Sequence, residues 1–321
     1  MDPLDDLFGA LRVANAMHAR LEAAAPWGIR FVEGETARFG LMVEGACRLE
    51  VEGRAAIPLA AGDCYVVMRG RAYSLRDAAG SPTRNCFDVI GDRVGGTIAL
   101  GGEGTRTCVI TGWFRFDELG ARPLLGLMPD LVLGRLDQAR SDALQAALQM
   151  LATETAGPGL GSGIVVSRLT DILLIHAIRQ HAMAAGPEET GWLGALADRK
   201  LLPAFRALHG GGDRRWTGEA LAARCGMSRS AFAAYFRARV GETPLAYDSH
   251  WRMLRAGALL RAGGLSIGEI AARAGYESEA AFSRAFRRQV GVAPGQFRRA
   301  RVGDPIAEVR AGAQGSLEAV A

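Results

Sequence analysis

The chain has 321 residues, enough for two or three domains that each bury a hydrophobic core. Its net charge of +4 is unevenly distributed, since Arg214 to Arg301 holds 16 arginines and 6 acidic residues, a net +10, and the rest holds 22 basic and 28 acidic residues. A basic C-terminal unit on a mildly acidic body indicates a nucleic-acid-binding protein with a separate domain. The most apolar window, residues 164–178, contains Arg168 and Asp171 and is too short to span a bilayer.

The N-terminal sequence and the cysteines bear on where the protein works. The first residues, Met1-Asp2-Pro3-Leu4-Asp5-Asp6, are acidic and contain no apolar segment, unlike a signal peptide. No C-x-x-C spacing occurs among the five cysteines, which are Cys47, Cys64, Cys86, Cys108 and Cys225. We therefore expect a cytoplasmic protein with no membrane role and no structural disulfide.

Residues 29–116 predict an all-β unit. Strand-length segments at 39–43, 47–51, 64–68 and 108–116 are separated by glycine-containing turns. Many short strands broken by turns indicate a barrel or sandwich, and we place a first domain at residues 1–135. The glycine-rich residues 101–104 are expected to form a hairpin loop, because no helix pattern follows that could make a phosphate site.

The pattern then changes to helix. Apolar residues at helical spacing predict helices over residues 136–154 and 162–183. The second helix presents Val165, Leu169, Ile172, Leu173 and His176 along one side. This apolar stripe either packs on the barrel or pairs with the same helix of a second chain. We therefore predict a helical dimerisation and connecting region at residues 136–212, ending in a Gly-rich linker.

A helix-turn-helix pattern then occurs twice. The first copy contains Leu221-Ala222-Ala223-Arg224-Cys225-Gly226, then Phe232, Phe236, Gly241 and Pro244. The second contains Ile270-Ala271-Ala272-Arg273-Ala274-Gly275, then Phe282, Phe286, Gly291 and Pro294. Such self-similarity indicates a duplicated supersecondary unit. We place this domain at residues 213–303, followed by a tail at 304–321, and expect residues 213–301 to bind DNA alone.

Each copy predicts one helix that reads DNA. The glycine in the turn permits positive φ, and Ser228 and Ser278 are suitable N-caps. The phenylalanine pairs bury one face, so the opposite face points outward. The outward residues are Arg229, Ser230, Ala233, Ala234 and Arg237 in the first copy, and Glu279, Ala280, Ser283, Arg284 and Arg287 in the second. A continuous helix from Pro244 to Arg261 would place the two readers about one DNA turn apart, roughly 34 Å.

The second copy resembles a known family. The segment Gly275-Tyr276-Glu277-Ser278-Glu279-Ala280-Ala281-Phe282-Ser283-Arg284-Ala285-Phe286-Arg287-Arg288, followed by Gly291, Pro294 and Phe297-Arg298, is similar to the signature of the AraC-type transcription regulators. The resemblance covers residues 213–301 and implies seven helices, two reading helices joined by a long central helix, and binding to promoter DNA.

The resemblance also implies which residues contact bases. They correspond to Ser230, Ala233 and Ala234 in the first reader, and to Glu279, Ala280, Ser283 and Arg284 in the second. The first set departs from the family pattern in being chemically small. We therefore expect the first reader to use methyl contacts, DNA shape and the flanking Arg229 and Arg237, and the second to supply more base-specific energy.

The N-terminal half, over about residues 3–130, resembles the cupin-like sensor domain of a subgroup of these regulators. The motifs that carry this resemblance are Ala25-Pro26-Trp27-Gly28, Phe39 through Glu44-Gly45, Ala61-Gly62-Asp63, Arg69-Gly70 and Leu75-Arg76-Asp77. The resemblance implies a barrel that senses a ligand or signal and controls the DNA-binding half, usually within a dimer. The predicted fold is thus α+β and multidomain: cupin-like barrel, helical connecting region, and all-α double helix-turn-helix domain.

Some cupins are metal enzymes, and such a site needs convergent histidines and a carboxylate. Residues 29–116 contain no histidine, and Gly40 and Tyr73 stand where related sensor domains often carry one. We therefore expect no catalytic residue, no metal and no cofactor. A cupin enzyme fused to a DNA-binding domain and a cysteine-based redox sensor are the alternatives.

The leading prediction is a sequence-specific transcription regulator whose barrel senses a small, largely apolar molecule. Leu41, Val43, Tyr73 and Trp113 are the candidate effector-binding residues. The expected partners are double-stranded promoter DNA, the effector and a second copy of the chain, and RNA polymerase is a candidate partner.

Overall fold

A computed structural model describes residues 14–33, 37–68, 71–90, 96–115, 129–135, 142–157, 159–184, 191–210 and 215–299. The chain divides into two compact units. We call residues 14–115 with 130–181 the β unit, and the described residues from 182 to 299, together with Pro129, the helical unit. This arrangement confirms the predicted α+β multidomain fold.

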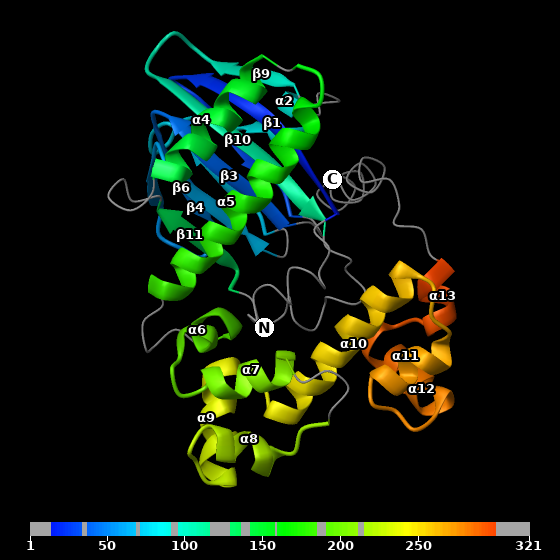
Figure 1. Cartoon of the computed structure of the whole chain (residues 1–321). Coiled ribbons are helices and arrows are strands. Elements are labelled where there is room, and N and C mark those ends of the chain that lie inside the picture. Colours follow the sequence, from blue (N-terminus) through cyan, green and yellow to red (C-terminus); the bar gives the residue numbers. More distant parts are fainter. Residues whose placement is uncertain are drawn as a thin grey trace, which may run out of the picture. The chain divides into compact units, whose positions relative to one another are not determined.

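The β unit contains two sheets (Figure 1). The six-stranded sheet has the order β11 (Leu131–Arg135), β6 (Asp63–Val67), β3 (Ala37–Glu44), β10 (Arg106–Arg115), β1 (Ala14–Ala24) and β9 (Thr97–Gly101). The five-stranded sheet has the order β5 (Ile57–Ala60), β4 (Ala46–Val51), β7 (Tyr73–Arg76), β2 (Gly28–Phe31) and β8 (Arg84–Asn85), and α2 (Cys86–Ile90) follows β8. The four strand segments predicted from the sequence fall on β3, β4, β6 and β10.

Side chains from both sheets form one core between them. On β1, Leu21 and Ala23 are buried in this core while Arg20 and Glu22 point to the other face. The centre is aromatic, because the rings of Phe31 and Tyr73 stack at 4.4 Å and Tyr65 meets Tyr73 edge-on at 5.6 Å. The rings of Phe31, Tyr65 and Tyr73 are buried in this core.

Two of the sequence motifs that carry the cupin resemblance, those containing Trp27 and Asp77, contact each other in this unit. The backbone N–H of Trp27 donates a hydrogen bond to Asp77 Oδ1 at 3.0 Å, so two segments 50 residues apart fix each other. The ring of Tyr65 requires a glycine at position 40, because a Cβ atom on residue 40 would lie 2.2 Å from that ring. The absence of a side chain at residue 40 therefore makes room for the tyrosine.

Helices α4 (Asp142–Ala156) and α5 (Ser162–Ala184) lie against the outer face of the six-stranded sheet (Figure 1). Arg20 Nη1 on β1 lies 3.4 Å from the carbonyl oxygen of Ala152 on α4. Gly134 on β11 approaches α5 so closely that a Cβ would lie 2.9 Å from Ala177. The helix predicted at 162–183 is confirmed, and the start of the one predicted at 136–154 lies outside the described residues. Among the described helices, none combines the length and apolarity needed to cross a membrane.

The glycine-rich residues 101–104 do not form the hairpin loop expected from the sequence. Strand β9 pairs in parallel with β1, and β10 pairs antiparallel with the other edge of β1, so β9 and β10 are separated by a strand. The loop instead packs on the end of β1, where Gly102 N donates to Ala24 O at 2.7 Å and Gly104 N donates to Ala25 O at 2.9 Å. The glycines do mark a turn between two strands, but only the sheet order could show that these two strands are not neighbours in the sheet.

The helical unit has the elements α6 (Trp192–Ala197), α7 (Leu202–Gly210), α8 (Gly218–Arg224), α9 (Arg229–Val240), α10 (Pro244–Ala262), α11 (Ile267–Arg273), α12 (Glu279–Val290) and α13 (Pro294–Arg299). Helices α7 to α13 are the seven that the family resemblance implied. Helix α7 lies before residue 213, where the sequence placed the start of the domain, and it packs into the first helix-turn-helix. Phe205 on α7 is fully buried, with its ring centroid 5.6 Å from that of Phe236 and 5.4 Å from that of Tyr247.

Candidate nucleic-acid interface

The first reading helix, α9, begins after a glycine turn. Gly226 has φ +64°, which glycine adopts without a Cβ clash, and Ser228 Oγ accepts a hydrogen bond from Ala231 N at 3.3 Å as the N-cap. Phe232 and Phe236 are fully buried on one face. The other face is exposed and carries Arg229, Ser230, Ala233, Ala234 and Arg237, as the sequence predicted.

The second reading helix, α12, has the same construction. Ser278 Oγ accepts a hydrogen bond from Ala281 N at 3.2 Å, and Ser266 with Glu269 forms a capping box on the preceding α11. Gly275 has φ +75° in the turn. Of the predicted contact residues, Glu279, Ala280, Arg284 and Arg287 are exposed and Ser283 is half-buried.

The charge of the two readers suits a polyanion. No ion pair engages Arg229, Arg237, Arg284 or Arg287 within residues 215–299, so these guanidinium groups are available to phosphates or guanine edges. The N-termini of both helices add partial positive charge at their capped ends. The ten predicted residues therefore lie on two reader faces.

Helix α10 joins the two readers without a break. It begins at the cap Thr243 and at Pro244 in the first turn, and its 19 residues span about 28 Å. Asp248 on α10 accepts from Arg252 Nε at 2.8 Å, and Arg252 Nη1 lies 3.4 Å from Ala274 O in the turn before α12. Burial raises the pKa of Asp248, while the Arg252 charge opposes that rise. Sequence reasoning missed this pair, because nothing in the i,i+4 spacing distinguishes it from a surface pair.

His209 closes the core between α7 and α10. Its Nε2 lies 2.7 Å from the Tyr247 hydroxyl, and its ring centroid lies 4.1 Å from that of Trp251. Burial, assisted by the charge of Arg255, lowers the pKa of His209 to about 3. The imidazole is therefore neutral in the folded protein at neutral pH.

This depressed pKa predicts a loss of stability in mild acid. The unfolded chain binds the proton below about pH 6.5 while the folded chain does not, so stability is complete above pH 6.5 and falls as the pH drops toward 3. Urea unfolding should show about 2 kcal/mol less stability at pH 5 than at pH 6.5. In His209→Gln this part of the slope should be absent, and an unchanged slope would contradict the assignment.

The candidate effector residues do not come together. Tyr73 lies in the interior of the β unit, where burial raises the pKa of its phenol to about 12. Leu41 lies on the outer face of the six-stranded sheet, beside a narrow apolar space of about 20 Å³ that Leu173 and Ala177 of α5 also line. Val43 and Trp113 are half-buried. A binding site composed of these four residues stays a prediction that the observed placement does not favour.

The cysteines are poorly suited to redox sensing. Cys47, Cys64, Cys86 and Cys108 are buried, and Cys225 is half-buried. Burial raises the pKa of the Cys47 and Cys64 thiols to about 12 and that of Cys108 to about 11. Because the thiolate is the reactive form, these side chains behave as small apolar residues at neutral pH.

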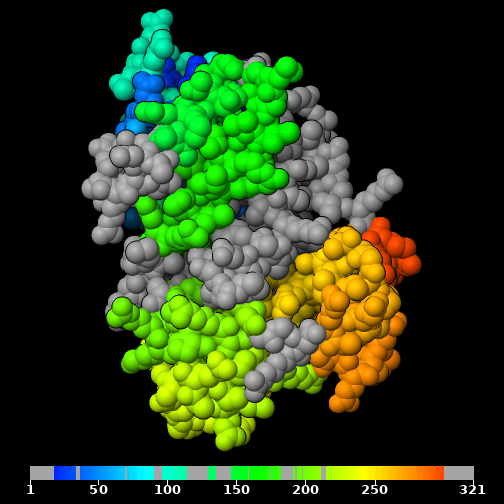
Figure 2. Space-filling model, in the orientation of Figure 1, coloured from blue at the N-terminus to red at the C-terminus, as the bar shows by residue number. Residues whose placement is uncertain are grey.

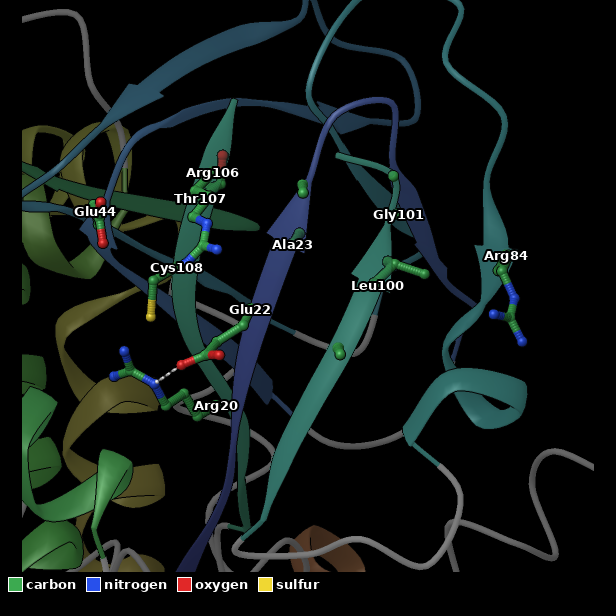
Figure 3. A pocket seen from close by; sticks show the side chains of 13 residues that line it. Arg20, Glu22, Ala23, Glu44, Arg84, Leu100, Gly101, Arg106, Thr107 and Cys108 are labelled. Carbon is green, nitrogen blue, oxygen red and sulfur yellow. Dashed lines mark hydrogen bonds and ion pairs between the residues drawn. The ribbon is translucent and has the colours of Figure 1, made fainter. Parts of the chain in front are cut away.

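A polar groove of about 600 Å³ opens on the β unit near the ends of β1, β9 and β10 (Figure 3). Its floor is made of small residues, and its charged side chains are Arg20, Glu22, Glu44, Arg84 and Arg106. Arg20 is already held by Glu22 at 2.8 Å, and Arg84 points away from the others in Figure 3. The charges do not converge on one point. As for metals, the described part of the chain holds no group of three His, Cys, Asp or Glu side chains that could bind an ion.

Comparisons with known proteins bear on both units. A family model described as Cupin matches residues 2–183, and one described as Helix-turn-helix domain matches residues 221–300. An AraC-like transcription regulator of Streptomyces lividans is 35% identical over 301 residues, which is 93% of this chain and 98% of the relative. One of Streptomyces antibioticus is 34% identical, with 93% and 99% covered. The HTH-type transcriptional regulator AlkR of Acinetobacter baylyi is 28% identical, again with 93% and 99% covered.

Proposed function

Because the chain belongs to the family of AraC-like transcription regulators and carries a cupin domain, we propose that α9 and α12 read promoter DNA and that the β unit senses a small molecule which controls this binding. The observation that carries the proposal is the pair of capped helices, each with a buried phenylalanine face and an exposed face bearing arginines that form no ion pair within residues 215–299. The relatives are transcription regulators, and we propose no catalytic role for the β unit.

The proposed input is a ligand rather than an oxidant. The raised pKa values of the four cysteines in the β unit favour packing over thiol chemistry. The rings of Phe31, Tyr65 and Tyr73 pack against one another in the interior, so a ligand bound among them would displace these side chains. Differential scanning fluorimetry of the full chain would show which candidate metabolites raise its melting temperature, and the DNA affinity of the chain with each such metabolite would be the second readout.

The proposed readers predict different roles for two arginines on α12. Arg284 is exposed toward the start of the helix and can donate to both O6 and N7 of a guanine. Arg284→Ala should cost about 1–3 kcal/mol on the cognate site and relax preference at one base pair. Arg287→Ala is the matched control: it should weaken cognate and random DNA alike and reduce the salt slope by about one.

The experiment begins with a footprint of the full chain on DNA upstream of neighbouring genes. Competition binding on single-base variants of that operator then gives the base preference of Arg284→Ala and that of Arg287→Ala. An equal loss on every sequence for Arg284→Ala would show that this residue positions the protein and does not read bases. Failure to find any protected site would remove the proposed function itself.

We propose that α5 also pairs with a second copy of the chain. Its outer side carries Ile164, 71% exposed, and Ile172, 46% exposed, and Leu160 just before it is fully exposed. Figure 2 shows α4 and α5 as a broad surface covering one side of the β unit. Leu169, which the sequence grouped with Ile172, is only 7% exposed and faces inward.

The exposed pair gives a specific test. Ile164→Glu with Ile172→Glu should give monomers by light scattering at micromolar concentration, because two charges would have to enter an apolar interface. These monomers should bind a paired operator more weakly than the wild type. Leu169→Glu is not a suitable substitute, since it would place a charge in the core. A monomeric wild-type chain, with and without DNA, would contradict the proposal.

A further inference from the structure

A half-buried cluster around Asp198 connects α6 with the first reading helix. Asp198 is the C-cap residue of α6. Its Oδ2 accepts a hydrogen bond from the Tyr235 hydroxyl at 2.6 Å and lies 3.3 Å from Nε of Arg239. Tyr235 and Arg239 are one turn apart on α9, so one carboxylate engages two successive turns of the same helix. We call Asp198, Tyr235 and Arg239 the Asp198 clasp.

Helix α6 contacts α9 at both of its ends. Before α6, Gly191 N donates a hydrogen bond to Arg239 O at 2.7 Å. After α6, Lys200 N donates to Asp198 Oδ1 at 2.8 Å, and Lys200 Nζ lies 5.5 Å from the centre of the Tyr235 ring. Along the chain, α6 is the first described element after α5. These contacts hold α9 against the first described element of the helical unit.

The clasp is charged and shielded from water. The side chains of Asp198 and Arg239 are 9% and 14% exposed. Burial alone would raise the pKa of Asp198, but hydrogen bonds from Tyr235 and Lys200 N and the charge of Arg239 outweigh it, so this pKa lies below its ordinary value. The hydrogen bond to Asp198 raises the pKa of Tyr235, which stays a donor. Charge-assisted bonds of this kind are stronger than neutral ones.

The position of the clasp on α9 separates it from the reading face. At 100° per residue, Tyr235 and Arg239 lie on roughly the opposite side of the helix from Ala233 and Arg237. The clasp therefore touches no DNA when the exposed face is in the groove. The core contacts of Phe236 fix the depth of α9 in its own bundle, and the clasp adds an anchor on the side of the helix next to the phenylalanine face.

We propose that the Asp198 clasp positions the first reading helix, so that α6 sets how α9 meets its part of the operator. Asp198 is a positioning residue in this proposal. The inference rests on the proposed role of α9 as a reader, and it assigns to α6 a part in DNA binding that neither helix-turn-helix unit contains.

The test uses the full chain and hydroxyl-radical footprints on the operator. Base pairs at which Arg284→Ala relaxes preference mark the half read by α12, and the half read by α9 lies about one turn away. Asp198→Asn removes the charge with little change in size, and Tyr235→Phe removes one hydroxyl. Glu50→Gln is the control, because it breaks an ion pair with Arg76 of 2.9 Å in the β unit.

In Asp198→Asn at saturating protein, the depth of protection should fall in the α9 half, while the α12 half stays fully protected. Tyr235→Phe should shift in the same direction by less, and Glu50→Gln should leave both halves unchanged. Equal losses on both halves would show a merely structural role, and unchanged protection in both clasp variants would also overturn the proposal. If the wild-type chain fails to protect an α9 half at all, the proposed reader role fails instead.

Discussion

A fragment of residues 191–303 should fold and bind DNA, whereas a fragment of residues 213–303 should be largely unfolded. The shorter fragment lacks α7, whose buried side chains are Ala204, Phe205, Ala207, Leu208 and His209. Phe205 lies against Phe236 and Tyr247, so its removal exposes the core under α9. Removal of a buried phenylalanine side chain alone costs about 3–5 kcal/mol, comparable with the whole stability of a small domain.

Circular dichroism and urea unfolding of the two fragments would measure this difference. Phe205→Ala in residues 191–303 should lower the free energy of unfolding by about 3–5 kcal/mol. Leu245→Ala is the matched control, since Leu245 is 52% exposed on α10 and its truncation should change stability by about 0.5 kcal/mol or less. A stable, DNA-binding fragment of residues 213–303 would show that α7 is dispensable and that the domain starts where the sequence placed it.

The affinity of the helical unit for its operator should fall about a thousandfold between 50 and 200 mM salt. The residues from Arg214 to Arg301 carry a net charge of +10, and the four arginines named on the reader faces lack carboxylate partners within residues 215–299. If about six phosphates are neutralised, log K should fall with log salt at a slope of about −5, because each contact releases condensed counterions.

Fluorescence anisotropy over a salt series would give the slope. Arg237→Gln should make it shallower by about one if Arg237 contacts a phosphate. Measured in the full chain, Arg54→Gln, in the exposed turn between β4 and β5, removes a charge of the same type from the β unit and should leave the slope of the full chain unchanged. An affinity that does not change with salt would exclude phosphate contacts as the main source of binding.

The readers could be predicted from sequence because their signals are local. A serine cap and a glycine with positive φ lie within four residues of the start of each reading helix, and two phenylalanines one turn apart define its buried face. The role of α7 could not be predicted in this way. Its nine residues precede a run of glycines, and only the contact of Phe205 with α9 and α10 shows that it belongs to the same core.

The β unit was predicted in outline and missed in its details. Strand β1 is rich in alanine and also contains leucine, arginine and glutamate, all of which favour helix, and pairing with β9 and β10 overrides that preference. The four effector candidates were chosen by residue type. Leu41 lies on the outer face of the six-stranded sheet, whereas Tyr73, on the five-stranded sheet, points into the core between the sheets. The sequence could not show this difference, because it depends on register and on which sheet each strand joins.

We expect the contact of Arg252 with the turn before α12 to limit how much the spacing of the two operator halves can vary among the promoters that this protein is proposed to bind. Arg215, from the segment before α8, lies over the ring of Tyr276 in that same turn at 5.3 Å, so both helix-turn-helix units are tied to one another beside α10. One inserted base pair rotates the two halves of an operator by about 34° relative to each other. We therefore expect base changes opposite Ala233 and Ala234, the proposed contact residues of α9, to be tolerated more readily than insertions or deletions between the halves.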